Sequence, residues 1–181
     1  NDKIGLAGIG VGRQGGGVFG SAAASKYCRP VAVADVNINT ARQLAARYKI
    51  EAYQDYRKLL ERKDVDAVVT GTPDHWRALV CIHCAQAGKD IYAEKPLTLT
   101  IREGRLIVEA VRKYNRVLQT GSQQRSNPIN RYGCELVRNG RIGKITRVIA
   151  HNYPSPWECG LPAQPVPEGL DWDFWCGPVE V

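Results

Sequence analysis

Three glycines near the N-terminus have the spacing of a backbone turn that can bind a diphosphate. Gly10, Gly12 and Gly15 fit the pattern G-x-G-x-x-G, directly after an apolar run that contains Gly8. One glycine permits a tight turn, the next lets the backbone approach a diphosphate, and the third lets helix and strand pack closely. A side chain at Gly10 is therefore expected to block the ligand while sparing the fold. The alternative is a plain glycine-rich turn, which is common.

A helix that opens after this turn would present free N–H groups to an anion, with Arg13 at its start. Asp35 follows about twenty residues later, at the end of a second β-rich run, as dinucleotide-binding folds place their acidic residue. A carboxylate there can accept hydrogen bonds from both hydroxyls of an adenosine ribose and would repel a 2′-phosphate. The combination predicts a nicotinamide dinucleotide as cofactor and favours NAD over NADP. A strand-end aspartate without a ligand is the alternative.

A second loop, after the β-rich run 66–70, carries residues that could contact the same cofactor. Thr72 and Pro73 stand where the backbone must bend around a ligand, and Asp74 could cap the next helix. His75 would then lie in the first turn of that helix. We expect Thr72, Pro73 and His75 to contact the cofactor, although a purely structural histidine is the alternative.

Lys95 is the candidate catalytic residue. It follows the short run 90–93 and stands between Glu94 and Pro96. The proline biases Lys95 toward an extended conformation, so the lysine is expected to point into the crevice at the ends of the strands. A partly desolvated lysine there could donate to a substrate oxygen or take part in proton transfer. Glu94 and Lys95 are both expected to lie beside the cofactor.

The elements that must position these loops alternate between strand-like and helix-like patterns. Such alternation predicts βαβ units and a doubly wound parallel sheet, the Rossmann architecture. A capping box from Thr100 to Glu103 opens the last of these helices. The expected strands are 3–9, 30–36, 66–70, 90–93 and 116–120, and the expected helices are 15–27, 40–49, 55–63, 75–88 and 101–115.

The pattern changes after Gly121. A helix is predicted over 128–139, a strand over 145–151, and an irregular segment rich in Pro, Gly and Trp over 154–178. Because a strand and a loop cannot bury themselves, the chain is expected to stop inside a second domain. We therefore predict a dinucleotide-binding domain over 1–122 and the incomplete start of an α+β substrate and oligomerisation domain over 123–181.

Composition excludes several other classes of protein. No apolar run reaches the roughly 18–20 residues of a membrane span, and no basic stretch alternates with aromatics as in nucleic-acid binding. The net charge of +7 is spread along the chain, which fits a solvated basic surface or attraction of an anionic small molecule. Cys81 and Cys84 fall in an apolar-periodic stretch and are expected to pack; no second Cys/His pair stands at zinc spacing, so no metal is expected. A cytoplasmic location is expected, and a periplasmic one stays open because the N-terminus looks trimmed.

Longer runs of the sequence resemble one family of oxidoreductases. The run from Gly71 to Trp76 (GTPDHW), the run from Ala87 to Thr100 with its E-K-P, the run 121–127 (GSQQRSN) and the run 169–173 (GLDWD) are similar to the glucose–fructose oxidoreductase, inositol dehydrogenase and MocA family. The resemblance implies a Rossmann domain followed by a domain built on a large, open, mostly antiparallel sheet. It also implies that Lys95 serves the reacting hydroxyl of the substrate beside the nicotinamide, and it places Gln123 among the cofactor contacts.

The sequence also departs from that family. Arg77 stands where many relatives have the second histidine of a His-Trp-His sequence. The family's other acid–base residues, an Asp and a His, come from the second domain beyond position 181, and His151 does not match that role. The resemblance implies an NAD-dependent oxidoreductase of a sugar or polyol, homo-oligomeric at full length. An NAD-dependent glycoside hydrolase and a non-catalytic dinucleotide-binding protein are the alternatives.

Overall fold

The computed structural model describes residues 3–152 and 160–179. Its contacts group the chain into two compact units. The first contains the residues up to Gly121 together with those from Val166 onward, and the second runs from Ser122 to Pro165.

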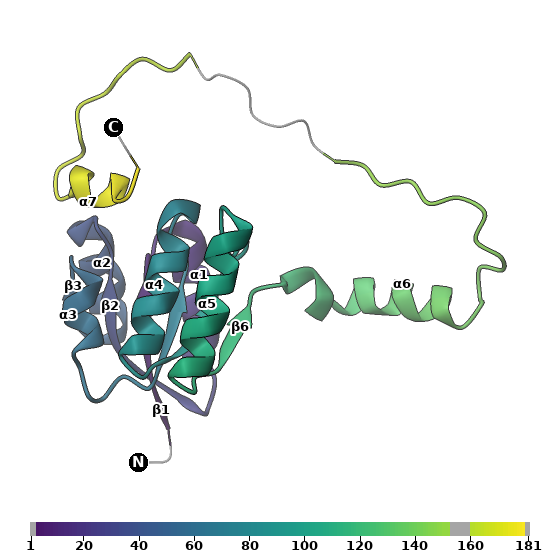
Figure 1. The fold of residues 1–181 in the computed structure, drawn as a ribbon, viewed down its shortest axis with the longest axis horizontal. Coiled ribbons are helices and arrows are strands. Elements are labelled where there is room, and N and C mark those ends of the chain that lie inside the picture. The colour runs from purple at the N-terminus through teal and green to yellow at the C-terminus, as the bar shows by residue number, and fades with distance from the viewer. Residues whose placement is uncertain (1–2, 153–159, 180–181) are drawn as a thin grey trace. The chain divides into compact units, whose positions relative to one another are not determined.

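The first unit is built on one parallel sheet (Figure 1). Its strand order is β3-β2-β1-β4-β5-β6, and each strand runs parallel to its neighbours. The order reverses between β1 and β4, which is the switch point where doubly wound sheets bind ligands. The predicted Rossmann architecture is confirmed, and the short edge strand β3 is an addition to it. The strands are β1 (Ile4–Ile9), β2 (Cys28–Ala34), β3 (Glu51–Tyr53), β4 (Ala67–Thr70), β5 (Asp90–Ala93) and β6 (Leu118–Thr120).

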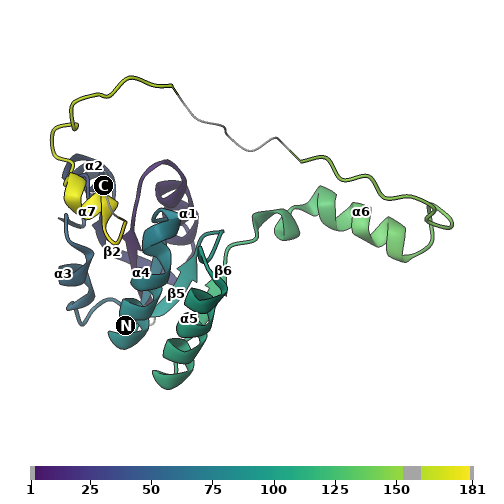
Figure 2. The same ribbon diagram turned by 45° about the horizontal axis from the view of Figure 1, so that its top comes forward.

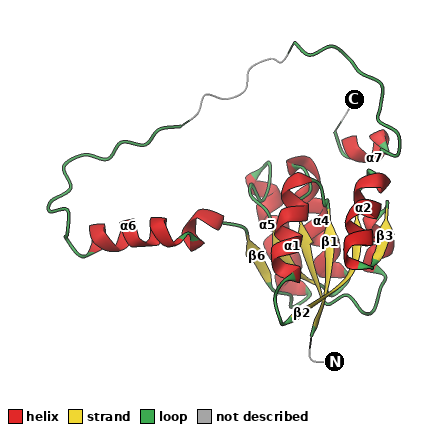
Figure 3. Ribbon diagram, turned by 180° about the vertical axis from the view of Figure 1, so that it is seen from behind, coloured by secondary structure: helices red, strands yellow, loops and turns green. Residues whose placement is uncertain are grey.

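Helices cover both faces of the sheet. Figure 1 shows α3, α4 and α5 on one face, and Figure 3 shows α1 and α2 on the other. Phe19 of α1 anchors one core cluster together with α2, and Leu59, Val80 and Ile107 anchor the other beneath α3, α4 and α5. Two buried faces explain why the central strands are nearly continuous apolar runs. The helices are α1 (Arg13–Ala23), α2 (Ile38–Tyr48), α3 (Tyr56–Leu60), α4 (Asp74–Gln86) and α5 (Ile101–Lys113).

Side-chain caps fix where several helices begin. The predicted capping box is present: Thr100 Oγ accepts from the N–H of Glu103 at 3.2 Å, and Glu103 accepts from the N–H of Thr100 at 3.1 Å. The predicted cap at Asp74 is wrong, because α4 begins at Asp74 itself and Pro73 occupies the N-cap. Proline fixes the backbone at that position, and Asp74 instead places a negative charge in the first turn, where the helix dipole favours it.

The second unit contains a short 3₁₀ helix, η1 (Gln123–Ser126), and α6 (Pro128–Arg138). The predicted helix 128–139 is confirmed, and Gly140 follows it with φ +67. The strand predicted over 145–151 is wrong: these residues form no strand, and Val148 is 82% exposed. A strand needs hydrogen-bonding neighbours, and the described residues offer this segment none.

A last helix, α7 (Trp172–Cys176), belongs to the first unit. Figure 2 shows it beside α2. Asp171 caps this short helix by accepting from the N–H of Phe174 at 2.9 Å. Across the described part of the chain, every helix falls short of the length and apolar character needed to cross a membrane.

Candidate functional site

The three motif glycines have three different environments. Gly10 has φ +69, and a Cβ there would lie 2.8–2.9 Å from the backbone and side chain of Thr72. A Cβ on Gly15 would collide with the carbonyl of Gly10, so this glycine permits α1 to pack against the loop. A Cβ on Gly12 would meet no atom within 4 Å. Only Gly12 therefore faces open space, where a diphosphate could approach the start of α1.

This arrangement corrects the expectation that a side chain at Gly10 would spare the fold. Gly10 holds a left-handed conformation against Thr72, so its substitution strains the protein itself. Gly8 likewise serves packing, because a Cβ there would lie 2.8 Å from Val11 and 2.9 Å from Phe19. Gly71 was not among the predicted site residues, yet a Cβ on it would lie 2.5 Å from the Cα of Gly15. The position of Gly71 directly after β4, at the switch point, could have identified it as a site residue from the sequence.

Asp35 directly follows β2 and is tied to the glycine loop. Its Oδ2 accepts from the N–H of Val11 and its Oδ1 from the N–H of Asn37, each at 2.9 Å. Burial raises the pKa of Asp35, and the N–H donors of Asn37, Val11 and Gly12 offset part of that rise. The carboxylate is therefore held half-buried at the C-terminal ends of the strands, beside the glycine loop. This is the position that its spacing from the glycines predicts.

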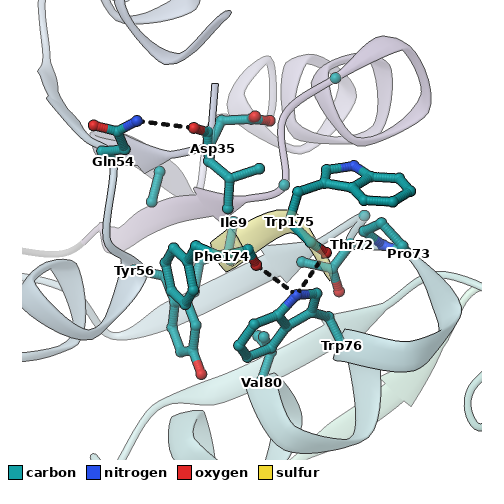
Figure 4. A pocket seen from close by; sticks show the side chains of 15 residues that line it. Ile9, Asp35, Gln54, Tyr56, Thr72, Pro73, Trp76, Val80, Phe174 and Trp175 are labelled. Atoms are coloured by element: carbon teal, nitrogen blue, oxygen red, sulfur yellow. Dashed lines mark hydrogen bonds between the residues drawn. The ribbon is translucent and has the colours of Figure 1, made fainter. Parts of the chain in front are cut away.

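A cavity of about 250 Å³ opens at this edge. Gly10 and Gly12 line it from the loop after β1, Asp35 from the end of β2, and Thr72 and Pro73 from the loop after β4. Most of the remaining lining is apolar or aromatic, and half of it comes from α3, α4 and α7 (Figure 4). The structure thus brings the predicted loop, acidic residue and second loop around one cavity.

His75 and Arg13 both begin helices. His75 lies in the first turn of α4, and its Nε2 pairs with the backbone carbonyl of Trp175 at 2.9 Å. This hydrogen bond joins α4 to α7. Arg13 is exposed as the first residue of α1. Cofactor contacts by either side chain stay predictions.

Glu94 and Lys95 lie at the end of β5 with opposite environments. Glu94 is 4% exposed; its carboxylate accepts from Gln14 Nε2 at 3.4 Å and from the N–H of Lys95 at 3.1 Å. Lys95 is exposed. Glu94 thus links β5 to the first turn of α1, and Lys95 is left on the accessible side. A Cβ on Gly121 would lie 3.2 Å from Glu94, so that glycine makes room for the carboxylate.

Arg77 connects the two loops that carry the candidate residues. It is 4% exposed on α4, and its guanidinium donates to the backbone carbonyls of Thr72 and Pro96. A third bond reaches Asp74 Oδ1 at 3.2 Å. The arginine thereby holds the loop after β4 and the loop containing Lys95 in one arrangement. In the sequence, Arg77 stands out only as a departure from the family's His-Trp-His pattern, because its bonds to the two loops leave no local signal.

Two other predictions concern residues away from the cavity. Cys81 and Cys84 are fully buried as expected, and burial raises the pKa of Cys81 to about 12 and that of Cys84 well above its usual value. These thiols therefore pack as apolar groups. Gln123 lies in η1, in the second unit, and its cofactor contact stays a prediction.

A parallel sheet of this order, with a glycine turn and an acidic residue at its switch point, defines the class of dinucleotide-binding Rossmann domains. The sequence profile of the Gfo/Idh/MocA oxidoreductases, described as an oxidoreductase family with an NAD-binding Rossmann fold, matches residues 3–122. The chain belongs to this family, as the sequence resemblance implied.

Among curated proteins, levoglucosan dehydrogenase of Pseudarthrobacter phenanthrenivorans is 30% identical over 92% of this chain and 45% of its own length. Myo-inositol 2-dehydrogenase of Thermotoga maritima is 31% identical over 69% of this chain and 38% of its own. The chain therefore spans less than half the length of these relatives.

Solved structures of similar oxidoreductases have the same fold as this chain. Myo-inositol 2-dehydrogenase of Lactobacillus plantarum superposes with a TM-score of 0.73 at 25% identity, covering 79% of this chain and 43% of that one. A variant of a 3-ketoreductase from Actinomadura kijaniata, in complex with TDP-benzene and NADP, superposes with a TM-score of 0.74 at 26% identity, covering 79% and 44%. Cofactor preference within the family must therefore be argued from each chain's own residues.

Proposed function

We propose that this chain is the cofactor-binding part of an NAD-dependent oxidoreductase that transfers a hydride between nicotinamide and a carbinol carbon of a sugar or polyol. The carrying observation is Asp35, held by two backbone N–H groups beside the glycine loop and the cavity. Its carboxylate accepts the ribose hydroxyls of the adenosine, while Gly12 lets the diphosphate reach the start of α1. Relatives named for inositol and levoglucosan support the substrate class.

The proposal divides the work between two parts of the chain. Residues 1–122 bind the cofactor, and residues 123–181 form the beginning of the substrate domain. Within the latter, the segment from Val166 onward packs with the first unit. NAD supplies the hydride acceptor when bound. Lys95, exposed at the end of β5, accepts the proton of the reacting hydroxyl during oxidation and returns a proton during reduction. Arg77 positions the loop that carries Lys95. The assembled enzyme is a homo-oligomer that acts in the cytoplasm.

The cofactor part is tested by calorimetric titration of the chain with NAD and with NADP. Because ionised Asp35 repels a 2′-phosphate, NAD should bind at least about tenfold more tightly, a difference of about 1.4 kcal/mol. Asp35→Ala should narrow that ratio, whereas Asp64→Ala, a surface aspartate in an ion pair with Arg62, should leave it unchanged. Equal affinities in the unaltered protein would reject NAD selectivity.

The catalytic part is tested in the intact natural protein, with NADH formation followed over a panel of polyols and sugars. Lys95→Ala should lower kcat by about 10²–10⁴, the range for a positioned acid–base group, with little change in NAD affinity. Lys63→Ala, at a surface position on another loop, is the matched control and should leave kcat unchanged. If Lys95→Ala keeps more than half of the activity, Lys95 is not the acid–base group.

A further inference from the structure

The segment from Glu168 to Gly177 lies far along the chain from the profile match yet is fastened to the Rossmann unit. The N–H of Ile38 donates to the carbonyl of Gly169 at 3.0 Å, and the N–H of Asp171 donates to the carbonyl of Val36 at 3.0 Å. Asn39 Nδ2 donates to the carbonyl of Glu168 at 3.0 Å. These bonds attach the segment to the residues that directly follow Asp35.

Aromatic packing fastens the other end of the segment. The Phe174 ring stacks on Tyr56, with centroids 6.0 Å apart and planes 6° from parallel, and meets Trp76 edge-on at 5.1 Å. Trp76 Nε1 donates to the carbonyl of Phe174 at 2.9 Å. Figure 4 shows these side chains among those that line the cavity, with Trp175 beside Thr72 and Pro73.

Two glycines show how closely the segment fits. Gly169 has φ +83, and a Cβ there would lie 2.5 Å from Asn39 Nδ2. Gly177 has φ +58, and a Cβ there would collide with the indole of Trp76. Both ends of the segment therefore require the absence of a side chain in order to dock.

The docked segment supplies two residues, Phe174 and Trp175, to the cavity that holds Asp35. Apart from Gln54 and Thr72, the side chains that line the cavity around Asp35 are apolar or aromatic, which suits the faces of a flat heterocycle better than a charged group. Asp35 holds the ribose on the adenosine side, so the base attached to that ribose is the group that enters. The nicotinamide end would then extend toward β5, which lies three places from β2 in the sheet.

We infer that the segment 168–177 completes the adenine pocket of the cofactor site, with Trp175 as its contact to the adenine ring. This inference rests on the proposed dinucleotide function. The chain beyond Gly121 thereby contributes to cofactor binding as well as forming the beginning of a substrate domain. The pocket is complete only when the segment 168–177, which follows residues 122–165 in the chain, packs against the parallel sheet.

The test compares Trp175→Ala with Trp172→Ala in calorimetric titrations of the full chain. The two tryptophans stack on each other at 5.1 Å and are similarly exposed, at 38% and 43%, but only Trp175 lines the cavity. Loss of one aromatic–base stack should weaken ADP-ribose and NAD by about tenfold. Trp172→Ala should change both by less than about threefold, and Trp175→Phe should recover most of the loss.

Nicotinamide mononucleotide, which lacks the adenine, is the ligand control; its affinity for Trp175→Ala should match that for the unaltered protein. Gly177→Ala, which undocks the segment while keeping both tryptophans, should reproduce the loss for ADP-ribose. If the unaltered protein binds ADP-ribose and Trp175→Ala binds it equally well, the adenine pocket is overturned and the proposed function stands. If the unaltered protein binds no ADP-ribose, the proposed function fails and this inference with it.

Discussion

Replacing Gly12 by alanine separates ligand binding from folding more cleanly than any other change in the loop. Gly12 is the N-cap of α1 with φ −61, a conformation open to other residues, and its Cβ would touch nothing. Alanine at an N-cap typically costs about 1 kcal/mol relative to a good cap, so the melting temperature should fall by about 2–4 °C. The fold should therefore persist.

The cost to binding follows from the same empty space. A Cβ at Gly12 stands between the backbone N–H groups at the start of α1 and any diphosphate there. Displacing the diphosphate breaks hydrogen bonds to a charged group, each about 1.5 kcal/mol, so losing two removes about 3 kcal/mol. That free energy corresponds to about a 150-fold rise in the Kd for NAD.

Calorimetric titration with NAD, beside thermal unfolding of the same samples, measures both effects. Gly17→Ala is the matched control, because Gly17 is an exposed glycine of the same helix whose Cβ also meets no atom within 4 Å. It should bind NAD normally. Gly10→Ala should instead destabilise the fold, since that position combines φ +69 with contact to Thr72. A Gly12→Ala protein that binds NAD within threefold of the original would refute the assignment of the diphosphate to this helix end.

Two further predictions follow from buried polar groups. Because burial raises the pKa of Asp35, NAD affinity should fall as pH decreases through that raised value, at a higher pH than the usual value near 3.9 for an aspartate; titrations in a pH series should show the fall, and Asp35→Asn should flatten it. Arg77→Ala should lower the free energy of unfolding by about 3 kcal/mol in urea, because the carbonyls of Thr72 and Pro96 lose their donor. Arg105→Ala, on α5, is its control, and an unchanged unfolding midpoint for Arg77→Ala would contradict the bridging role.

Local patterns predicted the sheet and the loops of the site because each signal was complete within a short run. The glycine spacing, the following helix and Asp35 all lie within one βαβ unit, so spacing alone could place them together. The capping box of Thr100 and Glu103 was likewise readable from four residues. The edge strand β3 has only three residues, too few to show a period.

Apart from the cap at Asp74, which the adjacent Pro73 displaces, the features that the sequence failed to predict depend on contacts distant in sequence. The run 145–151 has the composition of a strand, but no neighbour in the described residues pairs with it. The buried bonds of Arg77 depend on Pro96, and the cavity wall at Trp175 depends on a fold-back of more than a hundred residues. The docking of α7 has one local signal in the sequence, the glycines at 169 and 177. Their positive φ angles and lack of a side chain are explained only by the close approach of Asn39 and Trp76.

The order of the strands explains how one short domain can address both ends of a dinucleotide. Asp35 follows β2 and Lys95 follows β5, three places apart in the sheet. At about 4.8 Å per strand spacing this separation is about 14 Å, a distance that an extended dinucleotide can span. Gly12 and Gly15, in the loop between β1 and α1, would hold the diphosphate there: Gly12 leaves the approach open, and Gly15 lets α1 pack close. On the proposed function, Lys95 and Asp35 would serve the same cofactor without touching each other. Replacing Asp35 should then change cofactor affinity and leave kcat intact, whereas replacing Lys95 should lower kcat and leave NAD affinity intact.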